Sequence, residues 1–168
     1  MGAGFVDRGG RVIDADEITM RSIGQLGDNI AKHLMSRRWA GVEDYGFTGT
    51  LDPVTGRVDA SAAAPFEQAL GAYALLRYGR DASDELQREA VLAGREVLRA
   101  LGNVEVREVE PWADPIGASM TVVALSEIPL EMILGDQGLG DLRKRCLETL
   151  DGVYSVDGGF EEALPVAA

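Results

Sequence analysis

The sequence predicts an all-α fold in which helical hairpins form an arc of an α/α toroid, with an inner and an outer layer of helices. Between positions 66 and 76 the strongly polar residues are Glu67 and Gln68, so a helix over 64–78 is predicted to be buried on all sides. The next helical segment, 84–101, carries a single apolar stripe and is predicted to keep its other face in water. A mostly apolar segment at 116–134 and an amphipathic one at 139–150 repeat this alternation. Buried helices that alternate with amphipathic ones define two layers.

Residues 1–16 are predicted to form an N-terminal arm, and residues 17–168 the helical domain. In the arm, two short apolar pairs flank a Gly-rich turn, which allows either a small hairpin or an arm packed on the body, and we favour the arm. From 15 to 39 the apolar residues recur at helical spacing, which predicts an amphipathic helix.

Long and short connections also alternate along the chain. The long loops span 40–62, 102–115 and 151–159, and the short ones 80–83 and 135–138. We therefore expect all three long loops to emerge at the same end of the molecule. Pro65 suits the first turn of its helix, whereas Pro129 is predicted to break the 116–134 segment near Ile128.

Composition excludes several classes of partner. The 168 residues carry a formal net charge of -12, which argues against binding to nucleic acid or to an anionic membrane. With one Cys and one His the chain offers no zinc set, and no nucleotide-binding glycine motif is present, so we expect no metal and no cofactor. Calcium bound by the loop acids Asp44, Asp52, Asp59 and Asp157 is a minor alternative, because their spacing departs from the EF-hand pattern. Cys146 aligns with an apolar stripe and is predicted to be a buried structural thiol. His33 borders the stripe of its own helix and is predicted to be partly buried rather than catalytic.

The C-terminal segment repeats an earlier one. Phe160-Glu161-Glu162-Ala163-Leu164 echoes Phe66-Glu67-Gln68-Ala69-Leu70, which predicts that another buried helix begins near Phe160. We therefore expect the chain to be a fragment, and we expect its C-terminal apolar segment to pair with another polypeptide or with a second copy.

The run Asp157-Gly158-Gly159-Phe160 resembles the D-G-G-F/W turn of the prenyltransferase and squalene-cyclase repeat superfamily, whose members are α/α toroids. The resemblance covers the C-terminal third by motif and residues 45–101 by pattern. The D-x-D-D acid motif of the cyclases is absent. Pro65-Phe66-Glu67-Gln68 is similar to the thioester loop of complement-like toroid domains, but Pro65 replaces the Cys that this loop requires, which excludes a thioester.

The end that collects the long loops is rich in acids and aromatic residues, the pattern of a sugar-binding cleft. The leading prediction is therefore a carbohydrate-active enzyme of the glycoside hydrolase or polysaccharide lyase type. Its predicted catalytic acids are Glu67, Asp157 and Glu161, and its predicted binding platforms are Trp39, Tyr45, Phe47, Trp112 and Tyr154.

Two other functions stay open. An isoprenoid cyclase or transferase relative is the first, and a non-catalytic protein-interaction domain is the second. Acids about 5 to 9 Å apart across a groove favour the sugar hypothesis, whereas an aromatic lining without carboxylates favours the isoprenoid one. In the purely structural alternative, Trp39 and Trp112 fix loops onto helix ends, and Glu67 and Glu161 stabilise helix N-termini.

Overall fold

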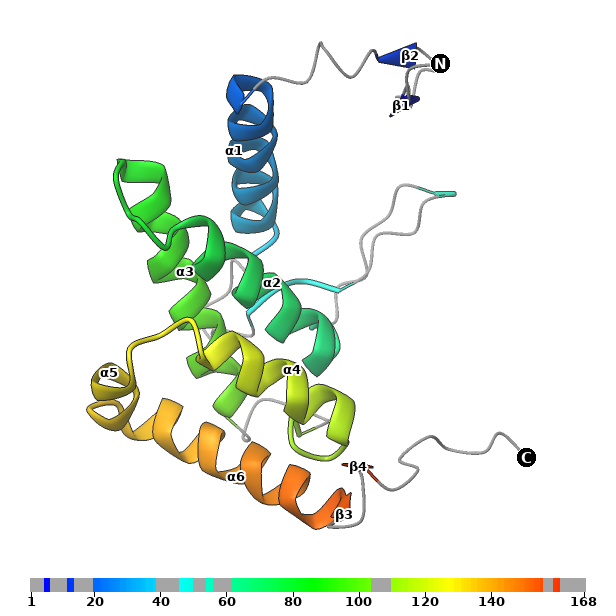
Figure 1. The fold of residues 1–168 in the computed structure, drawn as a ribbon, viewed down its shortest axis with the longest axis vertical. Coiled ribbons are helices and arrows are strands. Elements are labelled where there is room, and N and C mark those ends of the chain that lie inside the picture. The colour runs from blue at the N-terminus through cyan, green and yellow to red at the C-terminus, as the bar shows by residue number, and fades with distance from the viewer. Residues whose placement is uncertain are drawn as a thin grey trace.

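The computed structural model describes residues 5–6, 12–13, 20–38, 46–49, 54–55, 62–103, 110–155 and 159–160. This part of the chain is all-helical apart from two short hairpins, as the sequence predicted (Figure 1). The helices are α1 (Met20–Ser36), α2 (Pro65–Tyr78), α3 (Glu85–Gly102), α4 (Pro115–Leu125), α5 (Leu130–Leu134) and α6 (Gln137–Val153). The strands are β1 (Phe5–Val6), β2 (Val12–Ile13), β3 (Tyr154–Ser155) and β4 (Gly159–Phe160).

Four helices form the body of the molecule. The α2–α3 hairpin packs against a second hairpin made of α4 and α6, whose connection contains the short α5. Helix α2 contacts α4, and α3 contacts α6, so the two hairpins lie side by side; α1 packs across α2 and α3 (Figure 1). The core between them is filled by fully buried leucines: Leu75, Leu98, Leu101, Leu125, Leu139 and Leu142.

Helices α2 and α4 are equivalent positions of the two hairpins. Each begins with a proline in its first turn, at Pro65 and Pro115, where the missing N–H costs no hydrogen bond. Near their C-terminal ends, Arg77 Nη1 lies 3.3 Å from Glu127 Oε1, and these residues are 50 positions apart, the same interval that separates the two prolines. The two helices therefore run in register.

This interval corrects the repeat predicted from Phe66 and Phe160. Phe160 lies in β4, where it pairs with Tyr154 of β3, and it does not begin a helix. The residues after it lie outside the described part of the chain. The similarity between residues 66–70 and 160–164 was a weaker guide to the repeat than the positions of the prolines at helix N-termini. Proline restricts the backbone angle φ to helical values, whereas the five similar residues do not restrict it.

Burial of α2 and α4 is one-sided, which corrects the prediction of helices enclosed all round. Phe66 and Leu70 on α2 are 41% and 45% exposed, and Ile116 and Val123 on α4 are 50% and 45% exposed. Their opposite sides face α3 and α6. No described element covers the exposed side, so an apolar face remains open. Helix α3 has the predicted pattern, with Val97, Leu98 and Leu101 buried and its charged residues exposed, except for Arg95, which is half-buried.

Pro129 breaks the 116–134 segment, as predicted, since α4 ends at Leu125 and α5 begins at Leu130. Residues 5–6 and 12–13 pair as an antiparallel hairpin, so the alternative that we did not favour is correct. Cys146 is fully buried, as predicted, whereas His33 is exposed. None of the helices in the described ranges is long and apolar enough to cross a membrane.

Candidate functional site

Much of the predicted carboxylate and aromatic cleft lies outside the described residues. This is true of Trp39, Tyr45, Asp157 and Glu161. For Tyr154 the backbone is described, as part of β3. The structure therefore places three of the predicted site residues in detail: Glu67, Phe47 and Trp112.

Glu67 stabilises the N-terminus of α2. Its Oε2 accepts a hydrogen bond from the backbone N–H of Ala64 at 3.2 Å, which is half of a capping box. The side chain is otherwise exposed. This matches the structural alternative for Glu67, in which the acid supports a helix start.

Phe47 belongs to the core, which corrects its prediction as a binding platform. It is 5% exposed. The buried side chain of Gln68 holds it: Oε1 accepts from the Phe47 N–H at 2.7 Å, and Nε2 donates to the Phe47 carbonyl at 3.0 Å and to the Ala63 carbonyl at 3.3 Å. The amide thus pairs with the Phe47 backbone as a strand neighbour would, and it fixes residues 46–49 onto α2.

Trp112 fixes the segment before α4 onto α6. The Arg145 guanidinium carbon lies 4.6 Å from the centroid of the Trp112 ring, in a cation–π contact. The Trp112 carbonyl accepts a hydrogen bond of 2.8 Å from Thr149 Oγ1. One face of the ring is therefore occupied by a side chain of the protein.

A different hollow lies where the short connections are. It is a groove of about 700 Å³ between the α2–α3 turn and the α4–α5–α6 connection. Its walls are mainly apolar and come from α2, α3, α4, α5 and the α4–α5 connection: Leu76, Val91, Val122, Leu125, Ile128, Leu130, Met132 and Ile133. Leu130 and Met132 are 52% and 40% exposed, so α5 presents apolar surface at the edge of the groove.

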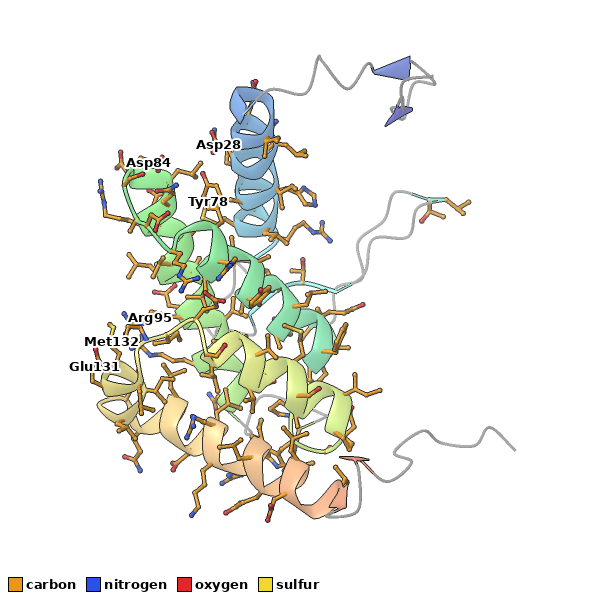
Figure 2. The ribbon with its side chains drawn as sticks, viewed as in Figure 1. Asp28, Tyr78, Asp84, Arg95, Glu131 and Met132 are labelled. Carbon is orange, nitrogen blue, oxygen red and sulfur yellow. The ribbon has the colours of Figure 1, made fainter. Side chains whose placement is uncertain are left out.

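Three arginines line the same groove. They are Arg80 in the α2–α3 turn, Arg95 on α3 and Arg143 on α6. Figure 2 shows Arg95 and Met132 near each other on one side of the molecule, although they come from α3 and α5. We call this hollow the arginine groove.

The three arginines have no carboxylate partner among the described residues. Elsewhere in that part of the chain, Arg38 pairs with Glu96, Arg77 with Glu127 and Arg99 with Asp136. The Arg95 Nε atom is buried and makes no hydrogen bond. Glu127 is the one acid among the described residues that line the groove, and its carboxylate is engaged by Arg77. The groove is therefore locally positive on a protein of net charge -12.

Asp136 holds the turn that leads into α6 at one end of this region. Its Oδ2 accepts from Arg99 Nε at 2.6 Å, and its Oδ1 accepts from the Leu139 N–H at 3.2 Å. Desolvation by itself raises the pKa of this carboxyl, but the hydrogen bonds from Arg99 and from the backbone outweigh it, and the pKa is lowered. The ionised Asp136 thus fastens the α5–α6 turn to α3 and positions the groove wall.

Sequence reasoning missed the arginine groove because its three arginines come from three separate segments, the α2–α3 turn, α3 and α6. One local signal was available. Arg95 and Arg143 have no acid three or four positions away, so neither can form the usual pair within its own helix, whereas Lys144 lies near Glu148. Only the packing of α3 against α6 brings the unpaired arginines together.

No group of three or more His, Cys, Asp or Glu in the described ranges is arranged to hold a metal ion. Comparison of the chain with protein-family models, with curated proteins and with solved structures gave no match.

Proposed function

We propose that this chain is a binding domain whose arginine groove holds an anionic ligand with an apolar body. The observation that carries this proposal is the convergence of Arg80, Arg95 and Arg143, without carboxylate partners, on a groove with apolar walls. In the described structure these guanidinium groups have no anion to neutralise, which leaves a site for one.

The arginines of the groove suit the anionic group of such a ligand, and the apolar walls suit its apolar body. Guanidinium groups form bidentate, charge-assisted hydrogen bonds with phosphate and carboxylate oxygens. Contact with the apolar walls contributes roughly 25 cal/mol of favourable binding free energy for each Å² of apolar ligand surface removed from water. A volume of about 700 Å³ is within the range of small-molecule sites. An isoprenoid-like chain with a phosphate or diphosphate head has this combination of groups.

The lining favours binding over chemistry. No aromatic ring is among the described residues that line the groove, so a carbocation would find no π face there. The single acid, Glu127, is paired with Arg77 and is poorly placed to serve as a free acid or base. We therefore propose a ligand carrier or sensor rather than a cyclase.

For the architecture, we propose that the two hairpins are neighbouring units of an α/α arc, with α2 and α4 in the inner layer. The 50-residue register of Pro65 and Pro115 supports this proposal. Pro165 follows at the same interval, outside the described residues. The resemblance to the prenyltransferase and squalene-cyclase repeat superfamily and the isoprenoid alternative both favour ligands with an isoprenoid chain.

The carbohydrate-active enzyme stays a prediction. Asp157 and Glu161, two of its three acids, lie outside the described residues. In the described part, Glu67, Phe47 and Trp112 have structural roles. No carboxylate pair across a groove supports the sugar hypothesis there.

Titration calorimetry with three matched ligands tests the proposed function. Farnesyl diphosphate carries both the anionic head and the apolar chain, farnesol carries the chain alone, and inorganic diphosphate carries the head alone. We expect farnesyl diphosphate to bind at least about tenfold more tightly than either fragment, because only it uses both the arginines and the apolar walls. Equal affinity for farnesol would contradict a role for the arginines.

Variants locate the binding. Arg95→Gln and Arg143→Gln should each weaken farnesyl diphosphate binding about tenfold or more, the loss of one charge-assisted contact of roughly 1.5 kcal/mol or above. Arg88→Gln is the matched control, since Arg88 is an exposed arginine on α3 that does not line the groove. Equal losses in all three variants would mean that net charge, not the groove, governs binding.

A further inference from the structure

A smaller hollow lies where the end of α1, the start of α2 and the segment 46–49 meet. It has a volume of about 250 Å³. Its described lining includes three ionisable side chains: His33 in the last turn of α1, Arg37 directly after that helix, and Glu67 in the first turn of α2. None of the described lining residues also lines the arginine groove. We call this hollow the α1–α2 hollow.

The backbone around the α1–α2 hollow is held by hydrogen bonds between three segments. The Thr48 N–H donates to the Arg37 carbonyl at 2.9 Å, and the Ala63 N–H donates to the Phe47 carbonyl at 3.0 Å. The buried side chain of Gln68 joins Phe47 to α2. The walls of the hollow are therefore in place before a ligand binds, which lowers the ordering cost of binding.

The two opposite charges of the hollow do not pair with each other. Arg37 donates from Nη2 to the Gly49 carbonyl at 3.2 Å, and Glu67 accepts through Oε2 from the Ala64 N–H at 3.2 Å. Within the described ranges, neither side chain has an ion-pair partner. Each contact fixes its side chain at one atom. The remaining N–H groups of the guanidinium and the second carboxylate oxygen are left for a ligand.

We propose that the α1–α2 hollow binds a free α-amino acid with an aliphatic side chain. The carboxylate of the amino acid accepts from the Arg37 guanidinium, and its ammonium group donates to the Glu67 carboxylate. Leu34, Phe47 and Ala63 supply the apolar lining for its side chain.

The charges and the size of the hollow disfavour other classes of ligand. A simple anion would lie beside the Glu67 carboxylate, and a simple cation beside the Arg37 guanidinium, so each would make one repulsive contact. The terminus of a peptide carries one of the two charges and would leave the other without a partner. The volume is below the range of about 300–1,000 Å³ of drug-sized sites, which suits a ligand of amino-acid size. His33 lies one helical turn before Arg37 and offers the carboxylate a second hydrogen bond.

An NMR titration of the isotope-labelled full chain tests the proposal. Leucine should shift the amide signals of residues 33–37, 47–49 and 67–71 in a saturable way. Isoamylamine lacks the carboxylate and 4-methylpentanoate lacks the ammonium group, so each should bind at least about tenfold more weakly than leucine, because one charge-assisted contact is lost. Absence of saturable shifts with leucine, valine and alanine at millimolar concentration, or equal binding of either analogue, overturns the proposal.

Two variants with matched controls locate the site. Glu67→Gln keeps an oxygen for the Ala64 N–H but removes the charge, and its control is Glu85→Gln, at an exposed glutamate in the first turn of α3. Arg37→Gln removes the guanidinium, and its control is Lys32→Gln, at an exposed position of α1 that does not line the hollow. Each site variant should weaken leucine binding about tenfold or more, and each control less than about twofold.

Circular dichroism checks that all four variants fold. Equal losses in a site variant and its control would mean that net charge, not the hollow, governs leucine binding, and would overturn the site. The outcome is independent of the farnesyl diphosphate titration, since none of the four substituted residues lines the arginine groove.

Discussion

The side chain of Gln68 is enclosed completely, yet it has a hydrogen-bond partner for each polar atom. Its neighbours explain how the backbone comes so close. Gly46 has φ of +79°, a conformation that glycine adopts without strain, and a Cβ at Gly71 would lie 2.5 Å from the Phe47 ring. One amide and two glycines therefore fix a segment that has no helix or sheet of its own.

Removing this amide should be costly. Gln68→Ala leaves the buried N–H of Phe47 without its partner and opens a cavity, although the Phe47 carbonyl keeps the Ala63 N–H at 3.0 Å. We expect the free energy of unfolding to fall by about 2 to 5 kcal/mol. Urea denaturation followed by circular dichroism measures the change. Gln137→Ala, at an exposed position, should cost less than about 0.5 kcal/mol. A similar small cost at Gln68 would contradict the role of the clamp.

Tyr78 ties α1 to the body. Its hydroxyl donates to Asp28 Oδ1 at 2.6 Å, and its ring packs on Gly27. Burial, followed by the hydrogen bond and the charge of Asp28, raises the pKa of Tyr78 to about 12. A raised pKa means that the contribution to stability is complete below the ordinary tyrosine pKa of about 10 and is lost as the pH rises through about 12.

An alkaline titration checks this contact. In the wild type, the ultraviolet absorbance of tyrosinate should show a late step near pH 12. Tyr78→Phe should remove that step, and the stability difference between the two proteins should shrink from about pH 10 upward. Tyr73→Phe should leave the late step in place. Persistence of the step in Tyr78→Phe would show that another tyrosine is responsible.

At the scale of elements, the helices differ in which sides find neighbours. The apolar composition of α2 and α4 predicted burial on every side, but α3 and α6 cover only one side of each helix. Helix α1 shows a related effect: Ala31 is buried against the body, whereas Ile23, Leu26 and Ile30 are about half exposed. An apolar side chain therefore predicts burial only where a second element is in reach.

Two helical glycines should respond in opposite ways to alanine. Gly24→Ala on α1 meets no atom within 4 Å and should stabilise the protein by up to about 1 kcal/mol through helix propensity. Gly71→Ala on α2 forces a methyl group against Phe47 and should destabilise it by about 1 to 3 kcal/mol. Thermal unfolding of the two variants beside the wild type measures both signs. Equal effects would mean that propensity outweighs packing at Gly71.

For the whole molecule, acidity and the arginine groove have to be considered together. The sum of charges is strongly negative, yet the groove gathers cations that no described acid neutralises. Net charge gave no information about cations that meet only after α3 and α6 pack together.

Cys146 reports on the integrity of the whole fold. It is buried in the core, burial raises its pKa to about 11, and the Thr121 hydroxyl lies close to the thiol. An aromatic disulfide reagent should therefore modify the native protein at the rate at which it opens, and that rate should rise with added urea. The fully denatured chain is the control for the intrinsic reactivity. Native labelling as fast as in the denatured chain would place the thiol at the surface.

The sequence alone determined the features that depend on neighbours along the chain. Helical spacing located the helices, Pro65 and Pro129 marked a beginning and a break, and the apolar stripe around Cys146 predicted its burial. These properties follow from backbone geometry and local periodicity. The long-loop site was argued from composition, and of its members the structure gives Glu67, Phe47 and Trp112 structural contacts.

Tertiary structure decided everything that depends on which elements meet. It left one side of α2 and α4 open, set them in a 50-residue register, and brought Arg80, Arg95 and Arg143 to one groove. No pattern within a single helix contains this information, because burial and charge pairing are properties of two surfaces in contact. For this protein the local sequence determined where the helices are, and the packing of one hairpin on the other decided which apolar and charged side chains are enclosed and which stay exposed.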